Sequence, residues 1–265
     1  MPKQQAESAL REMSGELEKF LRVLNASNVV DATGSIYSIS DTLGHYRAIK
    51  GMLNWGYKSG KVTLQLATNS VVCPERVQSL TCSLEIEVNG YVRAGKTAVP
   101  TLDDFEWGIT RTSMNLEFTG MTDPNAEAWS QYWHLDTHVD GPEANPPDEA
   151  HPMFHLHFGG QRMADRRQTK ANCWGQMLEL RGPRFAHPPM DLVLALDFIL
   201  ANTTGPRWKN EFCKDKDYTS VVCNAQHRFW KPYKRTLFEF YTSKRQDQER
   251  HDARKLWPTL RVKEV

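Results

Sequence analysis

The chain has 265 residues, of which 40% are hydrophobic and 25% are charged, and its formal net charge is +1. These proportions are typical of a folded soluble protein. No apolar run approaches the roughly 20 residues that a membrane-spanning helix needs, and the N-terminus has no apolar leader, so we expect no membrane partner and no secretion. The five cysteines show no CxxC spacing, which argues against a disulfide framework and a thiolate zinc site. These features predict a cytoplasmic location.

Charge is divided unevenly along the chain. Residues 1–157 contain 12 Lys and Arg against 20 Asp and Glu, whereas residues 158–265 contain 21 against 12. The first part therefore has a net charge of −8 and the second a net charge of +9. The split is consistent with a polyanion-binding surface in the C-terminal part, or with pairing of the two halves within one fold or one dimer.

The N-terminal two thirds of the chain contain one strong helix signal and then mainly strand signals. Apolar residues recur at helical spacing over residues 4–25, and a short helix is expected from Asp41 to Trp55. The dipeptide Asn89-Gly90 is typical of a two-residue hairpin, so Tyr91 to Arg93 should turn back along the preceding strand. The expected strands are residues 62–66, 81–88, 105–118 and 177–180.

The pattern then changes to helices. Pro188-Pro189 should stand in the first turn of a helix that runs to Leu200, followed by helices over residues 218–229 and 231–244 with a break at Pro232. Helix, strands and then helices predict an α+β fold: a central antiparallel sheet with an N-terminal helix and C-terminal helices packed on it. We expect one domain over residues 1–265, composed of a helical segment (1–30), a β-rich part (60–182), a helical part (188–245) and a charged tail (246–265).

Five of the nine histidines lie within residues 134–157. At the two-residue period of a strand, His134, Asp136 and His138 share one face. The same period places His151, His155 and His157 on one face of a second strand. The intervening apolar residues are Trp133, Leu135, Val139, Phe154, Leu156 and Phe158. We therefore expect a hairpin with one face in the core and the other carrying the chemistry.

The favoured hypothesis is metal-free catalysis on RNA or a nucleotide, because an imidazole can give or take a proton near neutral pH. Asp136 would orient one ring and fix its tautomer. The candidate catalytic residues are His134, Asp136, His138, His155 and His157. The candidate phosphate-binding residues are Arg162, Arg166, Arg181 and Arg184. The function predicted is that of a phosphodiester-directed hydrolase resembling an RNase.

Two alternatives stay open. In the first, a divalent metal such as Zn²⁺ or Mn²⁺ is bound and activates a water, or only stabilises the fold. Its candidate ligands are His134, His138, His155 and His157. In the second, the face is a non-catalytic module that binds a nucleotide signal or a protein, since a solvated sheet face accepts histidines without activity. The partners considered are RNA or a nucleotide, a protein chain and a second copy of this chain.

The hairpin has the spacing Tyr-x3-Asp-x-His followed, after a gap, by His-Pro-x2-His-x-His. Its members are Tyr132, Asp136, His138, His151, Pro152, His155 and His157. The pattern is similar to the histidine-rich core of the TumE-type toxins of bacterial toxin–antitoxin pairs, whose adjacent His-His pairs are absent here. The resemblance implies an effector of a prokaryotic defence or toxin–antitoxin system that acts on RNA or on translation.

Three further features concern the C-terminal part. Residues 181–191 place two arginines and a histidine before a helix, which predicts an anion site at the helix N-terminus. Asp197 interrupts an apolar helix, so it is either on the solvated side or buried with a partner. Residues 227–235 interleave aromatic rings with cations, a pattern found both in single-strand binding and in a helix whose rings face the core.

Overall fold

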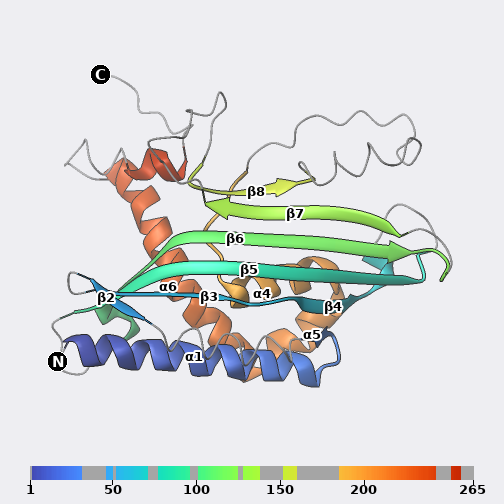
Figure 1. The fold of residues 1–265 in the computed structure, drawn as a ribbon, viewed down its shortest axis with the longest axis horizontal. Helices are drawn as coiled ribbons and strands as arrows, with labels where there is room; N and C mark the ends of the chain where they lie inside the picture. The colour runs from blue at the N-terminus through green and yellow to red at the C-terminus, as the bar shows by residue number, and fades with distance from the viewer. Residues whose placement is uncertain are drawn as a thin grey trace.

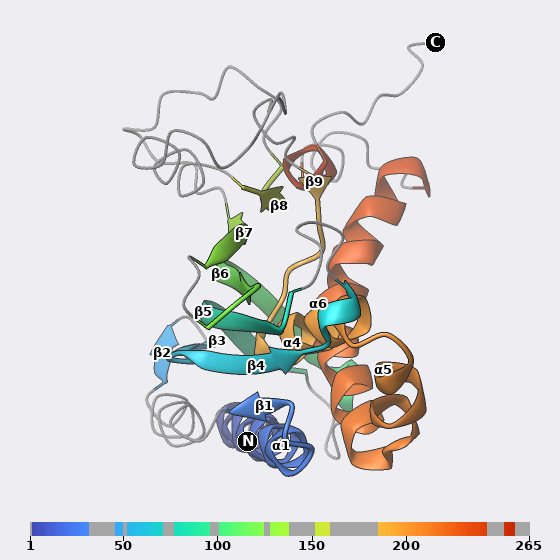
Figure 2. The ribbon, with the colours of Figure 1, turned by 90° about the vertical axis from the view of Figure 1, so that its right-hand side faces the viewer.

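The computed structural model describes residues 2–31, 46–49, 52–70, 77–95, 101–124, 128–137, 152–159, 185–242 and 252–257. Its strands form one antiparallel sheet, and helices α1, α4 and α6 pack against one face of it (Figures 1 and 2). The predicted α+β fold, with an N-terminal helix and C-terminal helices on a central antiparallel sheet, is confirmed. None of the described helices is both long and apolar enough to cross a membrane.

Helix α1 (Pro2–Ala26) confirms the predicted N-terminal helix. It buries an apolar stripe at the spacing that predicted it, including Leu10, Leu17 and Leu24. After the helix, Asn28 adopts a positive φ of 57°, a conformation that asparagine tolerates better than most residues. The chain thereby turns back into β1 (Val30–Asp31), which pairs with β4.

The sheet has the strand order β1-β4-β5-β6-β7-β8-β9, with β3 also paired to β5 and β2 paired to β3. All pairs are antiparallel. The strands are β2 (Arg47–Ile49), β3 (Met52–Lys58), β4 (Val62–Leu66), β5 (Ser79–Ala94), β6 (Phe105–Met121), β7 (Trp129–Thr137), β8 (Phe154–Phe158) and β9 (Phe185–Ala186). Short 3-10 turns are η1 (Thr68–Ser70), η2 (Leu102–Asp104) and η3 (Phe212–Lys214). The strand expected over residues 177–180 lies outside the described residues.

The hairpin expected at Asn89-Gly90 is wrong, because β5 runs straight through this dipeptide. The register between β5 and β6 shifts at this point by a bulge. A side chain at Gly90 would lie 2.4 Å from the carbonyl oxygen of Gly108 and 2.5 Å from the ring of Trp55. The glycine therefore permits close packing inside a long strand rather than a turn.

The helix expected over residues 41–55 is also wrong where the structure describes it, because β2 and β3 occupy residues 47–49 and 52–58. Leu53, Trp55 and Tyr57 are buried and alternate with less buried residues. This two-residue period fits a strand that rests on the core with one face. The β-rich part thus begins before residue 60.

The C-terminal helices are α4 (Leu192–Thr203), α5 (Pro206–Asn210) and α6 (Lys216–Thr242), and residues 252–256 form a further helical turn. Asp191 caps α4, so the Pro188-Pro189 pair precedes the helix instead of standing in its first turn. The break expected at Pro232 is wrong, since α6 is one helix with this proline inside. Phe229 and Tyr233 are buried on either side of it, and their packing offsets the one hydrogen bond that the proline removes.

The core between the sheet and the helices contains a cluster of aromatic rings. Trp55, Trp107 and Phe229 meet at centroid distances of 6.0 to 6.4 Å. The guanidinium group of Arg228 lies 5.4 Å from the Trp107 ring and pairs with Glu16 of α1. This cluster ties α1 and α6 to the middle of the sheet.

Candidate functional site

Strands β7 and β8 bring four predicted site residues together, here called the histidine face: His134, Asp136, His155 and His157. His134 lies directly opposite His157, and Asp136 lies opposite His155. Leu135 and Leu156 point to the other side and belong to the core. The expected hairpin, with an apolar and a histidine-bearing face in matching register, is therefore present.

The imidazole rings of His134 and His157 stack on each other. Their centroids are 4.6 Å apart and their planes differ by 9°. Both side chains are only partly buried. The stack places two imidazoles, each a group that can give or take a proton near neutral pH, side by side on the histidine face.

Asp136 links the stack to the neighbouring strand β6. Its Oδ2 lies 3.4 Å from Nε2 of His134, and its Oδ1 accepts a hydrogen bond of 3.0 Å from the Ser113 hydroxyl group. A carboxylate at this position can orient the His134 ring. The Ser113 hydroxyl group in turn fixes the orientation of the carboxylate. The sequence predicted the orienting role of Asp136 but gave no role to Ser113.

His155 is the buried member of the histidine face, with 4% of its surface exposed. Its Nδ1 lies 2.9 Å from the carbonyl oxygen of Pro152. A carbonyl oxygen only accepts, so Nδ1 carries a proton and Nε2 is the atom that can exchange one. The His155 ring meets the His157 ring edge-on at 4.9 Å. His155 is therefore better placed to position His157 than to contact a substrate.

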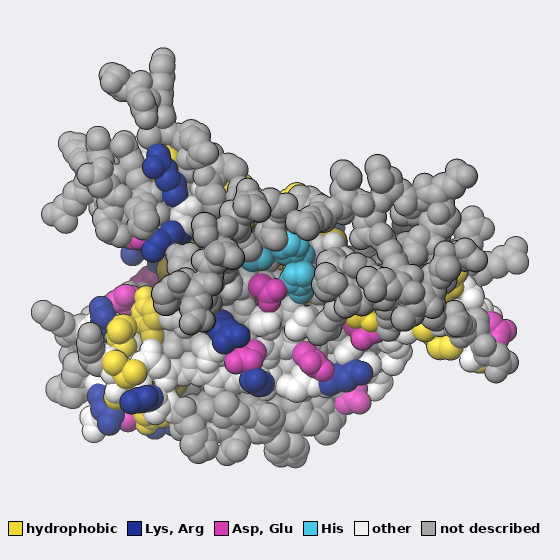
Figure 3. Space-filling view, turned by 45° about the horizontal axis from the view of Figure 1, so that its top comes forward, with side chains coloured by type: hydrophobic (Ala, Val, Ile, Leu, Met, Phe, Trp, Pro, Cys, Tyr) yellow, Lys and Arg dark blue, Asp and Glu magenta, His cyan; other side chains and the backbone are white. Residues whose placement is uncertain are grey.

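The rest of this sheet face is polar and charged. On β6, Asn115 lies opposite His134, and Glu117 lies opposite Tyr132, whose hydroxyl group donates to it at 2.6 Å. Further along the face, a hydrogen bond from Lys58 lowers the pKa of Glu87. Figure 3 shows the histidine side chains gathered beside acidic and basic ones. The alternation of Ser113, Asn115 and Glu117 with buried residues is the signal from which this polar surround could have been predicted.

Several predicted site residues lie outside the described residues. They are His138, His151, Arg162, Arg166, Arg181 and Arg184. The phosphate-binding prediction for the arginines therefore stays a prediction. The roles expected of His138 and His151 stay predictions as well.

Metal binding by the histidine face alone is not supported by its geometry. Within the described ranges, no group of three or more His, Cys, Asp or Glu side chains is arranged to hold a metal ion. The parallel stacking of His134 and His157 turns the faces of the rings, not their nitrogen atoms, toward each other. A ligand set that includes His138 would involve a residue outside those ranges.

The anion site expected at the N-terminus of the helix after residue 191 is filled by the chain itself. The Asp191 carboxylate is buried and accepts a hydrogen bond of 2.9 Å from the backbone N–H of Leu194. His187 is also removed from the histidine face: its backbone N–H donates to Phe154 and its ring contacts Phe198. Burial lowers the pKa of the His187 ring, which suits a structural, neutral histidine.

Asp197 has the partners that the sequence required of it. Its Oδ1 accepts hydrogen bonds from the Trp208 indole at 2.9 Å and from the Tyr218 hydroxyl group at 2.7 Å. These bonds join α4 to α5 and α6. The carboxylate is thus part of the helix packing.

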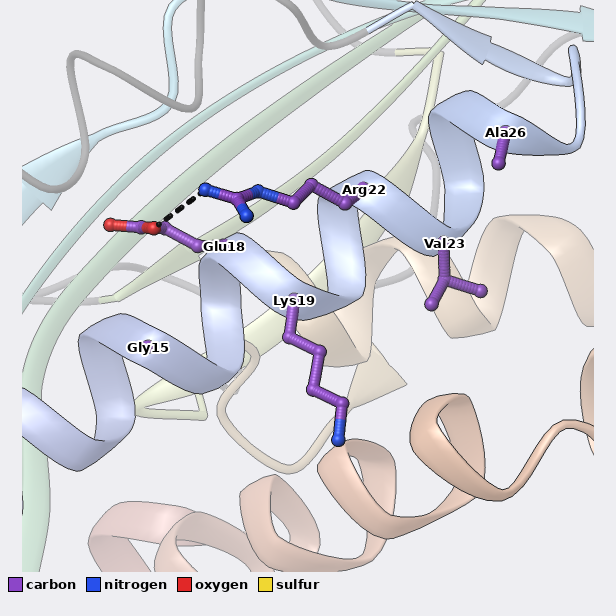
Figure 4. A pocket seen from close by; sticks show the side chains of 6 residues that line it. All are labelled: Gly15, Glu18, Lys19, Arg22, Val23 and Ala26. Carbon is purple, nitrogen blue, oxygen red and sulfur yellow. Dashed lines mark hydrogen bonds and ion pairs between the residues drawn. The ribbon is translucent and has the colours of Figure 1, made fainter.

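A shallow groove of about 380 Å³ runs along the outer side of α1, away from the histidine face (Figure 4). The described residues that line it all belong to this helix and include the ion pair between Glu18 and Arg22. Lys19 reaches from the groove to Asp217 at the start of α6. These side chains bridge elements of the fold and present no reactive group.

Comparison of the chain with profiles of known protein families, with curated proteins and with solved structures finds no match in any of the three.

Proposed function

We propose that the histidine face is the active site of a phosphodiester-directed hydrolase, an RNase-like effector that works by general acid–base catalysis. The observation that carries the proposal is the stack of His134 on His157, with Asp136 beside the first ring. Such catalysis needs two groups of suitable proton affinity within reach of one reacting centre. The resemblance of the hairpin to TumE-type toxins supports the choice of RNA and a role in a prokaryotic defence or toxin–antitoxin system.

The surroundings of the two rings suggest their roles. Asp136 lies beside His134, with Oδ2 3.4 Å from Nε2, and favours a proton on that ring, so the proton acceptor is assigned to its stacking partner His157. His134 is then the general acid and His157 the general base. His155 and Ser113 hold the geometry through contacts with His157 and Asp136.

The reaction that fits this pair is transesterification of RNA. His157 accepts the proton of a 2′-hydroxyl group of the RNA, and the 2′-oxygen forms a bond to phosphorus. The bond from phosphorus to the 5′-oxygen breaks, and His134 donates its proton to that leaving oxygen. The products are a 2′,3′-cyclic phosphate and a free 5′-hydroxyl group. Cations from residues 160–184, which follow β8 in the sequence, would neutralise the phosphate.

The proposal is tested by cleavage of a labelled RNA oligonucleotide in the presence of EDTA. We expect the wild-type protein to cut RNA but not DNA of the same sequence, which lacks the 2′-hydroxyl group. His134→Ala and His157→Ala should each lower the rate at least about 100-fold. Both side chains are partly exposed, so the melting temperature should change little. His227→Ala, at a surface histidine of α6, is the matched control and should keep full activity.

Three results would contradict the proposal. Full activity of both histidine variants would remove the histidine face from catalysis. Loss of wild-type activity in EDTA, restored by Zn²⁺ or Mn²⁺, would favour the metal-dependent alternative instead. Tight binding of a nucleotide without any cleavage would favour the non-catalytic module.

A further inference from the structure

The C-terminal half of α6 carries exposed aromatic rings. Phe238 and Tyr241 are 66% and 68% exposed, the largest values among the exposed large hydrophobic residues of the described chain. Together with Trp230 and Lys234 they recur at intervals of four, four and three residues, so all four lie on one side of the helix. We call these four residues the α6 stripe; it is about 16 Å long.

The neighbouring side of the same helix is occupied. Tyr233 and Phe240 are buried, and Leu237 packs with Tyr233 against Phe154 of β8. The interleaved rings and cations noted in residues 227–235 are thus divided. Phe229 and Tyr233 face the interior, and Trp230 is half-buried against the core, where its indole N–H donates to the carbonyl oxygen of Pro189. The rest of the stripe faces outward and extends one turn further. This division explains why the segment fits two patterns at once.

The α6 stripe is electropositive. Lys234 lies 5.5 Å from the Trp230 ring centroid, and Arg235 is exposed beside it. Lys231, one turn earlier, pairs with Asp103 of η2. Glu239 is the single acidic residue between residues 228 and 242. The cations on the outward side therefore outnumber the carboxylates.

Helix α6 packs on the side of β8 that faces away from the histidine face. The Tyr233 ring, on the inner side of the same helix segment, contacts the Phe154 ring at 6.4 Å. Phe154 directly precedes His155 on β8, and the end of α6 reaches the level of that strand (Figure 1). The α6 stripe is therefore a surface separate from the histidine face.

We propose that the α6 stripe binds single-stranded nucleic acid. Exposed rings stack with unpaired bases of any sequence, and neighbouring cations contact the phosphates. A helix that docks into a protein groove presents contiguous apolar anchors, whereas here Lys234 and Arg235 interrupt the rings. A duplex keeps its bases stacked inside and offers the rings no partner. The inference goes beyond the proposed function, because binding on this helix requires no turnover.

The test uses a fluorescently labelled oligodeoxythymidine, which lacks the 2′-hydroxyl group and is not a substrate of the proposed reaction. Fluorescence anisotropy of the full chain gives the dissociation constant. Phe238→Ala combined with Tyr241→Ala should weaken binding at least about tenfold, because stacking on each ring is lost. Both rings are mostly exposed, so the variant should melt near the wild-type temperature.

A second variant tests the phosphate contacts. Lys234→Gln combined with Arg235→Gln should weaken binding and reduce the salt dependence, lowering the slope of log K against log salt by about 1.4 in magnitude. The matched control is Lys214→Gln combined with Lys216→Gln, which changes two exposed lysines at the end of η3 and the start of α6. It should leave both quantities unchanged.

The proposal is overturned if the ring variant binds oligodeoxythymidine as tightly as the wild type. It is equally overturned if duplex DNA binds as tightly as the single strand. A ring variant that changes only the oligomeric state would also overturn it, because the stripe would then be an interface between copies of this chain. Retained binding by His157→Ala separates this inference from the catalytic proposal, since either can fail alone.

Discussion

Asp191 is the most deeply buried carboxyl group in the described part of the chain. It stabilises the start of α4, but its burial disfavours the ionised carboxylate and so makes stability depend on pH. It caps α4 through the Leu194 N–H, and the Tyr57 hydroxyl group accepts the next backbone N–H, that of Leu192, at 3.0 Å. Burial raises the pKa of Asp191 from 3.8 to about 6, although Leu194 and Arg228 act in the opposite direction and Glu16 adds to the rise. The folded protein therefore favours the protonated form.

The pH dependence of stability follows from this shift. Below about pH 4 the Asp191 carboxyl group is protonated in both states, and its contribution is fully present. Between about pH 4 and 6 the unfolded chain loses the proton first, so the free energy of unfolding falls by about 3 kcal/mol. Asp191→Asn keeps a capping side chain without the charge.

Urea unfolding of both proteins at pH 4, 5, 6 and 7 checks this prediction. The stability of Asp191→Asn relative to the wild type should rise by about 3 kcal/mol over that range. A difference that stays constant with pH would show that Asp191 ionises in the folded protein as it does in the unfolded chain.

In β5, packing decides whether a glycine stands in a turn or permits close contact inside a strand. Gly90 lies against the Gly108 carbonyl group and the Trp55 ring with no room for a Cβ atom. Gly90→Ala should therefore lower the free energy of unfolding by about 1 to 3 kcal/mol, since backbone atoms must move.

The matched control is Gly15→Ala in α1, where nothing lies within 4 Å of the new Cβ atom. This substitution should raise the free energy of unfolding by about 1 kcal/mol, because alanine has the higher helix propensity. Chemical denaturation measures both variants. Equal effects at the two glycines would mean that the close approach at Gly90 does not exist.

The elements also show what local sequence can and cannot predict. The amphipathic spacing of α1 and the two-residue alternation in β7 and β8 depend only on which face is buried, so the helix and the histidine-bearing hairpin were predictable. Asn89-Gly90 and Pro232 carry strong local preferences for a turn and a break. Both were overridden by partners distant in sequence: the long strand β6 at Gly90, and the core contacts of Phe229 and Tyr233 at the proline.

The candidate site was predictable to a similar degree. Residue identity and strand period indicate that His134, Asp136, His155 and His157 share a face. The stacking of two rings across the strands depends on which residues pair, and that register is set by β6, β7 and β8 together. Ser113 could not be chosen from its own segment, because its contact with Asp136 comes from the neighbouring strand.

At the scale of the whole molecule, the sheet separates the hydrophobic core from the candidate site. One face is covered by α1, α4 and α6 and holds the hydrophobic core, whereas the other carries the polar residues and the histidine face (Figures 2 and 3). Substitutions on the polar face can therefore change function with small effects on folding. Among the described residues, the basic excess of the C-terminal part includes Lys234 and Arg235 on α6.

The central claim is that two stacked imidazoles, one protonated and one neutral, perform the reaction. The pH dependence of the initial rate of RNA cleavage in EDTA tests it most directly. We predict a bell-shaped profile with its maximum near neutral pH, because the rate requires a neutral His157 and a protonated His134 together. A rate that rises through one ionisation and then stays constant at alkaline pH would contradict the account.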